Sequence, residues 1–329
     1  MSSRHTEIQR RGLFASPLLL APFALGQPAL AQDFPARPLR LLVPFAPGGF
    51  TDILARYIAD QLGRALGQPV VVENRPGAGG SIAAEQVAKA APDGHTLLLA
   101  SVAVFAINPA LYPSLPYDPA ALALVDVVAT QPNILLANPA SGIGSVPELI
   151  AAAKAKPGTI AYASNGNGSV THLTMAMLAA EAGIELLHVP YRGSAPGLVD
   201  LVAGRVQVMF DGAGTALPQV AGGAARAIGL SWDRRLAELP DVPPISATLP
   251  GFDMSAWFAL AGHAGMPGPV MTELRRAVGQ ILASEPFLRL LKERQAEPVR
   301  IGGADLPAFV AAERGRWAEA VRRSGARVE

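Results

Sequence analysis

The chain has 329 residues, of which 50% are hydrophobic and 16% are charged, and its 27 basic and 26 acidic side chains leave a formal net charge of +1. This composition is typical of a well-packed globular protein with two lobes or one large α/β domain, and it argues against disorder. The near-neutral balance gives no electrostatic basis for nucleic-acid binding. The absence of cysteine excludes disulfides, thiolate zinc sites and cysteine nucleophiles.

The N-terminal segment has the three regions of a secretory signal peptide. Arg4, Arg10 and Arg11 form a positive region, Leu13 to Leu25 is apolar, and Ala29-Leu30-Ala31 is a cleavage site of the A-x-A type. We therefore expect export to the periplasm and removal of residues 1–31. The Arg10-Arg11 pair leaves twin-arginine export open beside the general secretory (Sec) route. No later apolar run is long enough to cross a bilayer, so a soluble exported protein is expected.

Strand and helix patterns alternate along the next part of the chain. Short apolar runs bounded by Pro or Gly predict buried strands at 39–45, 70–72 and 96–100, and helical spacing predicts helices at 53–62 and 81–91. Thr51 is the expected N-cap of the first helix, and Gly67 is its expected stop. The alternation predicts a mostly parallel sheet with right-handed crossovers.

A second series of the same kind begins near Pro132. Strands are predicted at 133–138, 160–163, 186–189, 206–210 and 227–230, and helices at 145–154, 169–183 and 198–203. Ser145 and Glu148 have the spacing of a capping box at the start of the first of these helices. From about Pro267 the pattern is helical, at 270–283, 287–294 and 306–323. These two series predict two α/β lobes followed by a helical tail.

Two glycine-rich loops each connect a predicted strand to a predicted helix. They are Phe45-Ala46-Pro47-Gly48-Gly49-Phe50-Thr51-Asp52 and Ser164-Asn165-Gly166-Asn167-Gly168-Ser169. Glycine allows the backbone to approach a ligand, and the helix N-terminus adds unsatisfied N–H donors and partial positive charge. One such loop is a site for one anionic group, and two of them, one in each lobe, can hold a molecule with two anionic ends, although ordinary tight turns remain the alternative. For a third segment, 75–81, a ligand role and a tight connection are equally open.

Motifs of other protein classes are missing from the sequence. There is no P-loop, no G-x-G-x-x-G after the first strand, no G-x-S-x-G elbow and no H-E-x-x-H among the five histidines. We therefore expect no nucleotide or metal cofactor. His172 and Asp211 lie near the proposed site and could contact a ligand, but capping or packing roles are equally open. Asp52 falls in a helix first turn, where a carboxylate favours the dipole.

Several ordered runs resemble the Bug (TctC-like) family, the extracytoplasmic solute receptors of tripartite tricarboxylate transporters. They are PFAPGGFTDILAR (44–56), GQPVVVENRPGAGG (67–80), AKAAPDGHTLL (88–98), NPALYPSLPYDP (108–119), YASNGNGSVTHL (162–173), HVPYRGSAPGLVDLVAGRV (188–206) and LPDVP (239–243). The resemblance extends from about Asp33 to near the C-terminus. It implies a type II periplasmic-binding-protein fold, in which two α/β lobes close on a ligand in the cleft between them.

The resemblance also implies a function and a division into lobes. The first lobe would comprise residues 33–132 and 256–329, and the second 133–255. The protein would capture a small carboxylate, such as a di- or tricarboxylate, an acidic amino acid or an aromatic acid. It would not be an enzyme, and its partners would be the membrane permease subunits of the transporter. A monomer is expected, since one chain makes both lobes.

In this family the ligand is held largely by backbone N–H groups and water from the two loops. The residues that the resemblance and the loop patterns nominate for ligand binding are Pro47, Gly48, Gly49, Phe50, Thr51, Asp52, Ser101, Ser164, Gly166, Gly168, Ser169, His172 and Asp211. Phe50 departs from the small residue common at its position, and its ring would favour a less polar acid or block a polyanion. Two other functions stay open: a ligand sensor for a membrane signalling partner, and a carboxylate-processing α/β enzyme, for which no acid–base pair with a recognised spacing is present.

Overall fold

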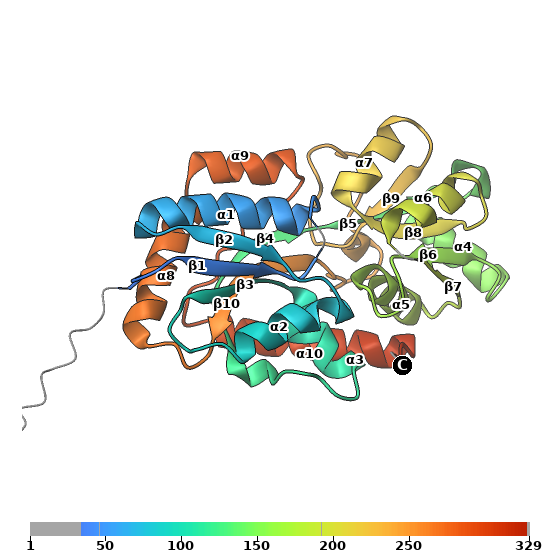
Figure 1. Cartoon of the computed structure of the whole chain (residues 1–329). Helices are drawn as coiled ribbons and strands as arrows, with labels where there is room; N and C mark the ends of the chain where they lie inside the picture. The colour runs from blue at the N-terminus through green and yellow to red at the C-terminus, as the bar shows by residue number, and fades with distance from the viewer. Residues whose placement is uncertain (1–33, 46, 192, 328–329) are drawn as a thin grey trace, which may run out of the picture. The chain divides into compact units, whose positions relative to one another are not determined.

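The computed structural model describes residues 34–45, 47–191 and 193–327. The signal peptide predicted for residues 1–31 lies outside the described residues, as does Ala46 of the first glycine-rich loop. The described strands form two five-stranded sheets, each covered by helices on both faces (Figure 1). The predicted fold class, two α/β lobes, is confirmed.

The first sheet has the strand order β2-β1-β3-β10-β4. Its strands are β1 (Leu39–Val43), β2 (Val70–Asn74), β3 (Thr96–Ser101), β4 (Leu122–Gln131) and β10 (Ala256–His263). β1 runs parallel to β2 and β3, whereas β10 is antiparallel to both β3 and β4. One face packs against α1 (Phe50–Leu66), α8 (Gly268–Leu282) and α9 (Glu285–Glu293), and the other against α2 (Ser81–Ala88) and α10 (Leu306–Ser324).

The second sheet has the order β7-β6-β8-β5-β9 and the same design. Its strands are β5 (Asn133–Ala137), β6 (Ala161–Ser164), β7 (Leu187–Pro190), β8 (Val208–Gly212) and β9 (Arg226–Leu230). β6 is parallel to its neighbours, and β5 is antiparallel to β8 and β9. α6 (Ser194–Val202) and α7 (Ala213–Ala221) cover one face, and α4 (Val146–Ala155) and α5 (Val170–Ala182) cover the other.

The chain passes from the first sheet to the second between Gln131 and Asn133, and returns between β9 and β10. We propose the lobe boundaries 33–132 with 256–329 and 133–255, which this distribution of strands supports. The last helix, α10, packs against α5 of the second sheet as well as α3 (Asn108–Leu111) and the preceding turn (Figure 1). The helical tail therefore packs against helices that belong to both lobes.

Three points of the sequence analysis need correction. The predicted mostly parallel sheet is wrong, because two of the four strand pairings in each sheet are antiparallel. Strands β4 and β10 were not predicted. Thr51 is not the N-cap of α1: the helix begins at Phe50, and the extended residue Gly49 takes the cap position. The Ser145 cap is confirmed, since its hydroxyl accepts from the N–H of Glu148.

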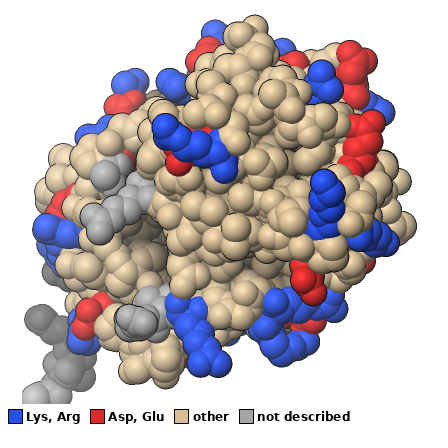
Figure 2. Space-filling model, turned by 90° about the vertical axis from the view of Figure 1, so that its right-hand side faces the viewer, with Lys and Arg blue, Asp and Glu red and all other residues tan. Residues whose placement is uncertain are grey.

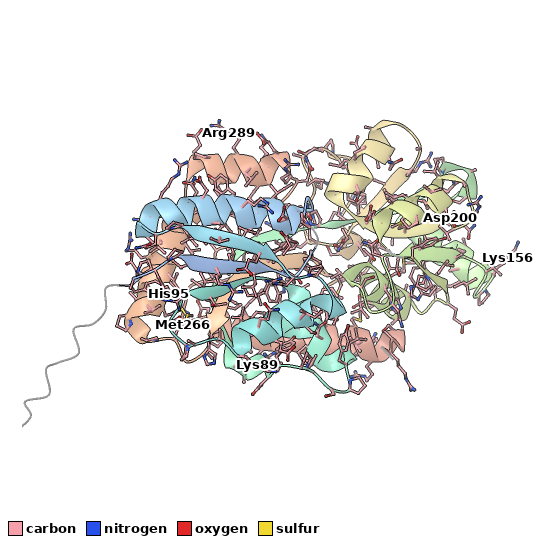
Figure 3. The ribbon with its side chains drawn as sticks, in the orientation of Figure 1. Lys89, His95, Lys156, Asp200, Met266 and Arg289 are labelled. Carbon is pink, nitrogen blue, oxygen red and sulfur yellow. The ribbon has the colours of Figure 1, made fainter. Side chains whose placement is uncertain are left out.

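Several charged side chains lie on the outer surface of the molecule. Lys89, Lys156 and Arg289 point outward from the ribbon in Figure 3, and Lys89 and Arg289 form only exposed ion pairs, with Glu85 and Glu285. On the face drawn in Figure 2, basic and acidic side chains are interspersed rather than gathered in one patch. No helix in the described ranges is both long and apolar enough to span a membrane.

Candidate functional site

A cavity of about 950 Å³ lies between the two lobes and is lined by residues of both. It opens at the ends of the strands that carry the two glycine-rich loops, and Gln131 and Asn133, which flank the crossing from β4 to β5, line it as well. Ligands of α/β proteins bind at such carboxyl ends of strands. This cavity is the candidate functional site.

Most of the residues predicted from the sequence line this cavity, namely Pro47, Gly49, Phe50, Thr51, Ser101, Gly166, Gly168, Ser169 and Asp211. Gly48, Asp52, Ser164 and His172 are outside its lining. The last three are almost fully buried. Asp52, Ser164 and His172 form hydrogen bonds that hold the two glycine-rich loops in their conformations.

Asp52 braces the first loop from the first turn of α1. One carboxylate oxygen, Oδ2, accepts from the backbone N–H of Gly48 and from Arg56 Nε, each at 3.0 Å. The other accepts from Asn74 Nδ2 at 2.9 Å, and Asn74 also donates to the carbonyl of Phe45. The hydrogen bond from Arg56 is the main reason that the pKa of Asp52 is lowered to about 2, so the brace is ionised at any physiological pH.

His172 braces the second loop in the same way. Its Nδ1 atom accepts from the backbone N–H of Gly168 at 3.0 Å, and its ring stacks on His188 with centroids 3.8 Å apart. His188 Nε2 lies 2.7 Å from the hydroxyl of Ser164, which in turn accepts from the N–H of Gly166. Burial, with a smaller contribution from His188, lowers the pKa of His172 to about 4, which keeps Nδ1 free to accept.

These braces decide which backbone donors are left for a ligand. The N–H groups of Gly48 and Gly168 are already used. Those of Phe50 and Thr51 in α1, and of Val170 and Thr171 in α5, fall in helix first turns, which offer no intrahelical acceptor. All four residues line the cavity. Two helix N-termini, one from each lobe, therefore present free donors and partial positive charge to the same space.

Three polar side chains of the cavity lining each have a buried atom without a hydrogen-bond partner. Ser101 Oγ, Asn133 Nδ2 and Asn165 Oδ1 are buried atoms that have no hydrogen bond within the described chain, and all three residues line the cavity. Ser101 and Asn133 are only 5% and 6% exposed. An unpaired buried polar atom costs free energy, so a ligand or water that paired with any of these three atoms would stabilise the protein.

Asp211, near the end of β8, is 1% exposed and is the one acidic residue among the described residues that line the cavity. Its Oδ2 accepts from the hydroxyls of Ser194 at 2.6 Å and Thr215 at 2.5 Å. Burial raises the pKa of Asp211 in spite of these hydrogen bonds. The group thus gives the second lobe's side of the cavity an acceptor.

The sequence analysis missed part of this lining. Asn133, Ser194, Thr215 and Phe258 were not predicted, and Gly79 shows that the third glycine-rich segment also reaches the cavity. Asn133 could have been found as the polar residue directly after Pro132, where the second series begins. Phe258 could not, because it lies on β10, which sequence patterns did not reveal.

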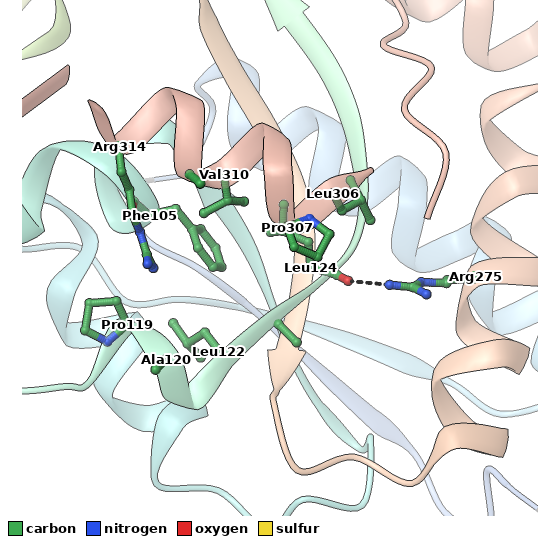
Figure 4. Close-up of a pocket in the computed structure, with 12 residues that line it drawn as sticks. Phe105, Pro119, Ala120, Leu122, Leu124, Arg275, Leu306, Pro307, Val310 and Arg314 are labelled. Atoms are coloured by element: carbon green, nitrogen blue, oxygen red, sulfur yellow. Dashed lines mark hydrogen bonds between the residues drawn. The ribbon is translucent and has the colours of Figure 1, made fainter. Parts of the chain in front are cut away.

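A second, smaller pocket of about 300 Å³ lies between α10 and β4 (Figure 4). Apolar side chains such as Phe105, Leu122 and Val310 line most of it. Its two arginines are engaged in structure: Arg275 donates to the carbonyls of Val125 and Leu124, and Arg314 to that of Phe105. This pocket has no free polar group comparable to those of the large cavity. Within the described ranges, no group of three or more acidic or histidine side chains could hold a metal ion.

Comparisons with known proteins agree with one another. The profile of the family described as "Tripartite tricarboxylate transporter family receptor" matches residues 54–326. Protein BugT of Bordetella pertussis is 36% identical over 315 residues, which cover 95% of this chain and 97% of BugT. The resemblance noted in the sequence is thereby confirmed.

Solved structures show the same fold. The structure of R. palustris Rpa4515 with adipate is 35% identical, with a TM-score of 0.79, and the match covers 90% of this chain and 100% of that one. MatC from Rhodopseudomonas palustris with bound malate is 33% identical, with a TM-score of 0.74 and coverages of 88% and 100%. The periplasmic binding protein BugD is 32% identical, with a TM-score of 0.75 and coverages of 90% and 100%.

Proposed function

The chain belongs to the tripartite tricarboxylate transporter receptor family, and we propose that it captures a small carboxylate between its lobes for the membrane subunits of such a transporter. The family and the solved relatives are solute-binding proteins, so this chain is a solute-binding receptor and not an enzyme. Two relatives were solved with dicarboxylates, adipate and malate. Those ligands support a carboxylate here.

One observation carries the proposal: two helix N-termini, from opposite lobes, face one cavity. The donors of Phe50 and Thr51 approach it from α1, and those of Val170 and Thr171 from α5. A carboxylate oxygen is the natural acceptor for such N–H groups. Because each lobe supplies donors, an anion between them would hold the lobes together, which is how a receptor of this kind closes on its ligand.

We divide the predicted site residues by task. Pro47, Gly49, Phe50, Thr51, Ser101, Gly166, Gly168, Ser169 and Asp211 would contact the ligand or its water shell, together with Asn133, Asn165, Val170 and Thr171. Gly48, Asp52, Ser164 and His172 would act as positioning residues, since their hydrogen bonds fix the loops. The proposed site needs no cofactor.

The proposal also covers location and assembly. The family members are periplasmic binding proteins, and we propose that residues 1–31 direct this chain to the periplasm and are then removed. We propose that it acts as a monomer, because residues of one chain line both sides of the cavity. The membrane subunits of the transporter would receive the loaded, closed form.

A thermal-shift screen of the protein purified from the periplasm of a bacterial host tests the proposal. The panel would contain small mono-, di- and tricarboxylates, acidic amino acids and aromatic acids, each beside its amide or ester. Free ligand at about 100 times its Kd should add about 2.7 kcal/mol, which shifts the midpoint by several degrees. Shifts with acids alone support a carboxylate receptor. Equal shifts with the uncharged partners, or no shift with any acid, would refute it.

A further inference from the structure

Part of the first-lobe wall of the cavity is aromatic. Phe50, from the first turn of α1, meets Phe258, from β10, edge to face with ring centroids 5.0 Å apart and planes inclined by 67°. Phe45, Leu111 and Tyr112 also line the cavity. Aromatic walls of this kind favour flat or bulky hydrocarbon surfaces, and they offer nothing to a ligand made only of charged groups.

The second-lobe wall has the opposite character, because it holds a buried carboxylate. Asp211 accepts hydrogen bonds from Ser194 and Thr215, and all three residues line the cavity. A ligand group placed against it gains by donating a hydrogen bond. A second ligand carboxylate there would instead meet a like charge within a poorly solvated space.

The register of β5 and β8 shows which face of the second sheet carries Asp211. Asp211 pairs with Ile134 and Gly212 pairs with Asn133, so the side chains of Asp211 and Asn133 lie on opposite faces. Asp211 shares its face with α6 and α7, whose Ser194 and Thr215 donate to it. A ligand hydroxyl can donate a hydrogen bond, so it suits the acceptor Asp211.

Resting on the proposed carboxylate-receptor function, we propose that the cavity selects monocarboxylic acids with an aromatic or alicyclic body and a hydroxyl group remote from the carboxylate. The carboxylate lies at the N-termini of α1 and α5, the body lies against Phe50 and Phe258, and the hydroxyl faces Asp211. Phe50 and Asp211 are the specificity-determining residues.

Isothermal titration calorimetry with four acids tests this selection. The probes are 4-hydroxybenzoate, benzoate, terephthalate and adipate, with the amide of 4-hydroxybenzoate as the uncharged control. The expected order places 4-hydroxybenzoate first, roughly tenfold or more tighter than benzoate, which lacks the hydroxyl, and than either dicarboxylate. If a dicarboxylate binds as tightly as 4-hydroxybenzoate, the selection is refuted while the carboxylate receptor stands. If no acid of the wider panel binds folded protein, the receptor function itself fails.

Two variants test whether Phe50 and Asp211 determine the preference for 4-hydroxybenzoate. Asp211→Asn should bring the affinities for terephthalate and 4-hydroxybenzoate closer by about tenfold, because the like charge is removed. Phe50→Ser should weaken both aromatic acids and leave adipate nearly unchanged. Asp60→Asn is the matched control, since Asp60 is an exposed residue of α1 that pairs with Arg64 and lies outside the cavity lining. A preference that survives in both site variants would contradict the assignment, and the ranking in the wild type tests the selection even where a variant fails to fold.

Discussion

His172 accepts a hydrogen bond from the backbone N–H of Gly168 through its Nδ1 atom, at 3.0 Å, and thereby fixes the second glycine-rich loop from inside the lobe. The first loop repeats the arrangement, with Asp52 accepting from Gly48 four residues before it. In both lobes a side chain of the first helical turn turns back to bind a glycine. The neighbouring N–H groups then remain available to a ligand.

The first prediction is that replacing His172 weakens ligand binding through the loop. His172→Ala should reduce affinity about tenfold and lower stability by about 1–3 kcal/mol, because the Gly168 N–H loses its buried acceptor. Titration calorimetry and urea unfolding measure the two effects. His263→Ala is the matched control: His263 also accepts from a glycine N–H, that of Gly265 at 2.9 Å, but outside the cavity lining. Equal loss of affinity in both variants would contradict a role for His172 at the loop.

The second prediction concerns pH. In the folded protein the pKa of His172 is lowered to about 4, chiefly by burial, and burial also lowers that of His188. Between about pH 4 and pH 6.5 the unfolded chain therefore binds more protons, so stability falls as the pH is lowered through this range. The contribution of His172 is about 3 kcal/mol.

Urea unfolding at several pH values checks this contribution. His172→Asn keeps an acceptor that does not titrate, so its stability should fall less than that of the wild type between pH 6.5 and pH 4. Ligand affinity of the folded wild type should fall only as the pH approaches 4, where His172 becomes protonated and its Nδ1 can no longer accept from Gly168. If the wild type instead gains stability relative to His172→Asn as the pH is lowered, the predicted direction of the pH effect is wrong.

The third prediction concerns Gly168→Ala and distinguishes two causes of destabilisation, the positive φ angle and the steric clash with Leu111. This residue has φ of +72°, and a Cβ there would lie 2.4 Å from Leu111 Cδ2, across the lobe boundary. Gly158 has φ of +70° with nothing within 4 Å of a Cβ. Gly168→Ala should therefore destabilise the protein and weaken binding more than Gly158→Ala does, and Leu111→Ala should restore part of the difference. Free energies of unfolding and of ligand binding, measured for the single and double variants, give the cost of the contact between residue 168 and Leu111. If the two glycine substitutions have equal effects, this contact does not contribute to the cost.

The fourth prediction concerns the anchor of α10. Glu313, which is 4% exposed, accepts from the indole N–H groups of Trp257 at 2.8 Å and Trp317 at 3.2 Å. Glu313→Ala leaves both buried donors unpaired and should cost about 2–5 kcal/mol in unfolding experiments. Glu319→Ala, on the same helix, removes only ion pairs with exposed arginines and should cost less than about 1 kcal/mol. Similar costs for the two would contradict a buried anchor.

Sequence patterns predicted the strand–loop–helix units well because Pro and Gly bound their short apolar runs. β4 and β10 escaped for physical reasons. β4 is separated from β5 by Pro132 alone, so no turn divides the two runs, and β10 is rich in Ala and contains Gly262. Their antiparallel pairing joins segments more than a hundred residues apart, which no local pattern encodes.

The candidate site shows the same limit. Both glycine-rich loops were identified from residue types alone, and they do border the cavity. Which of their groups face a ligand depends on hydrogen bonds that the sequence does not specify. Asp52 and His172 were nominated as ligand contacts, whereas in the fold they accept from Gly48 and Gly168 and support the loops.

The central claim is that one carboxylate binds between the N-termini of α1 and α5. The most direct measurement is the affinity, by titration calorimetry, of the acid that binds best and of its primary amide, which has the same shape without the charge. The account predicts that the acid binds and that the amide binds at least about a hundredfold more weakly. Equal affinity for acid and amide would contradict it, because the free N–H groups of the two helices would then play no part in recognition.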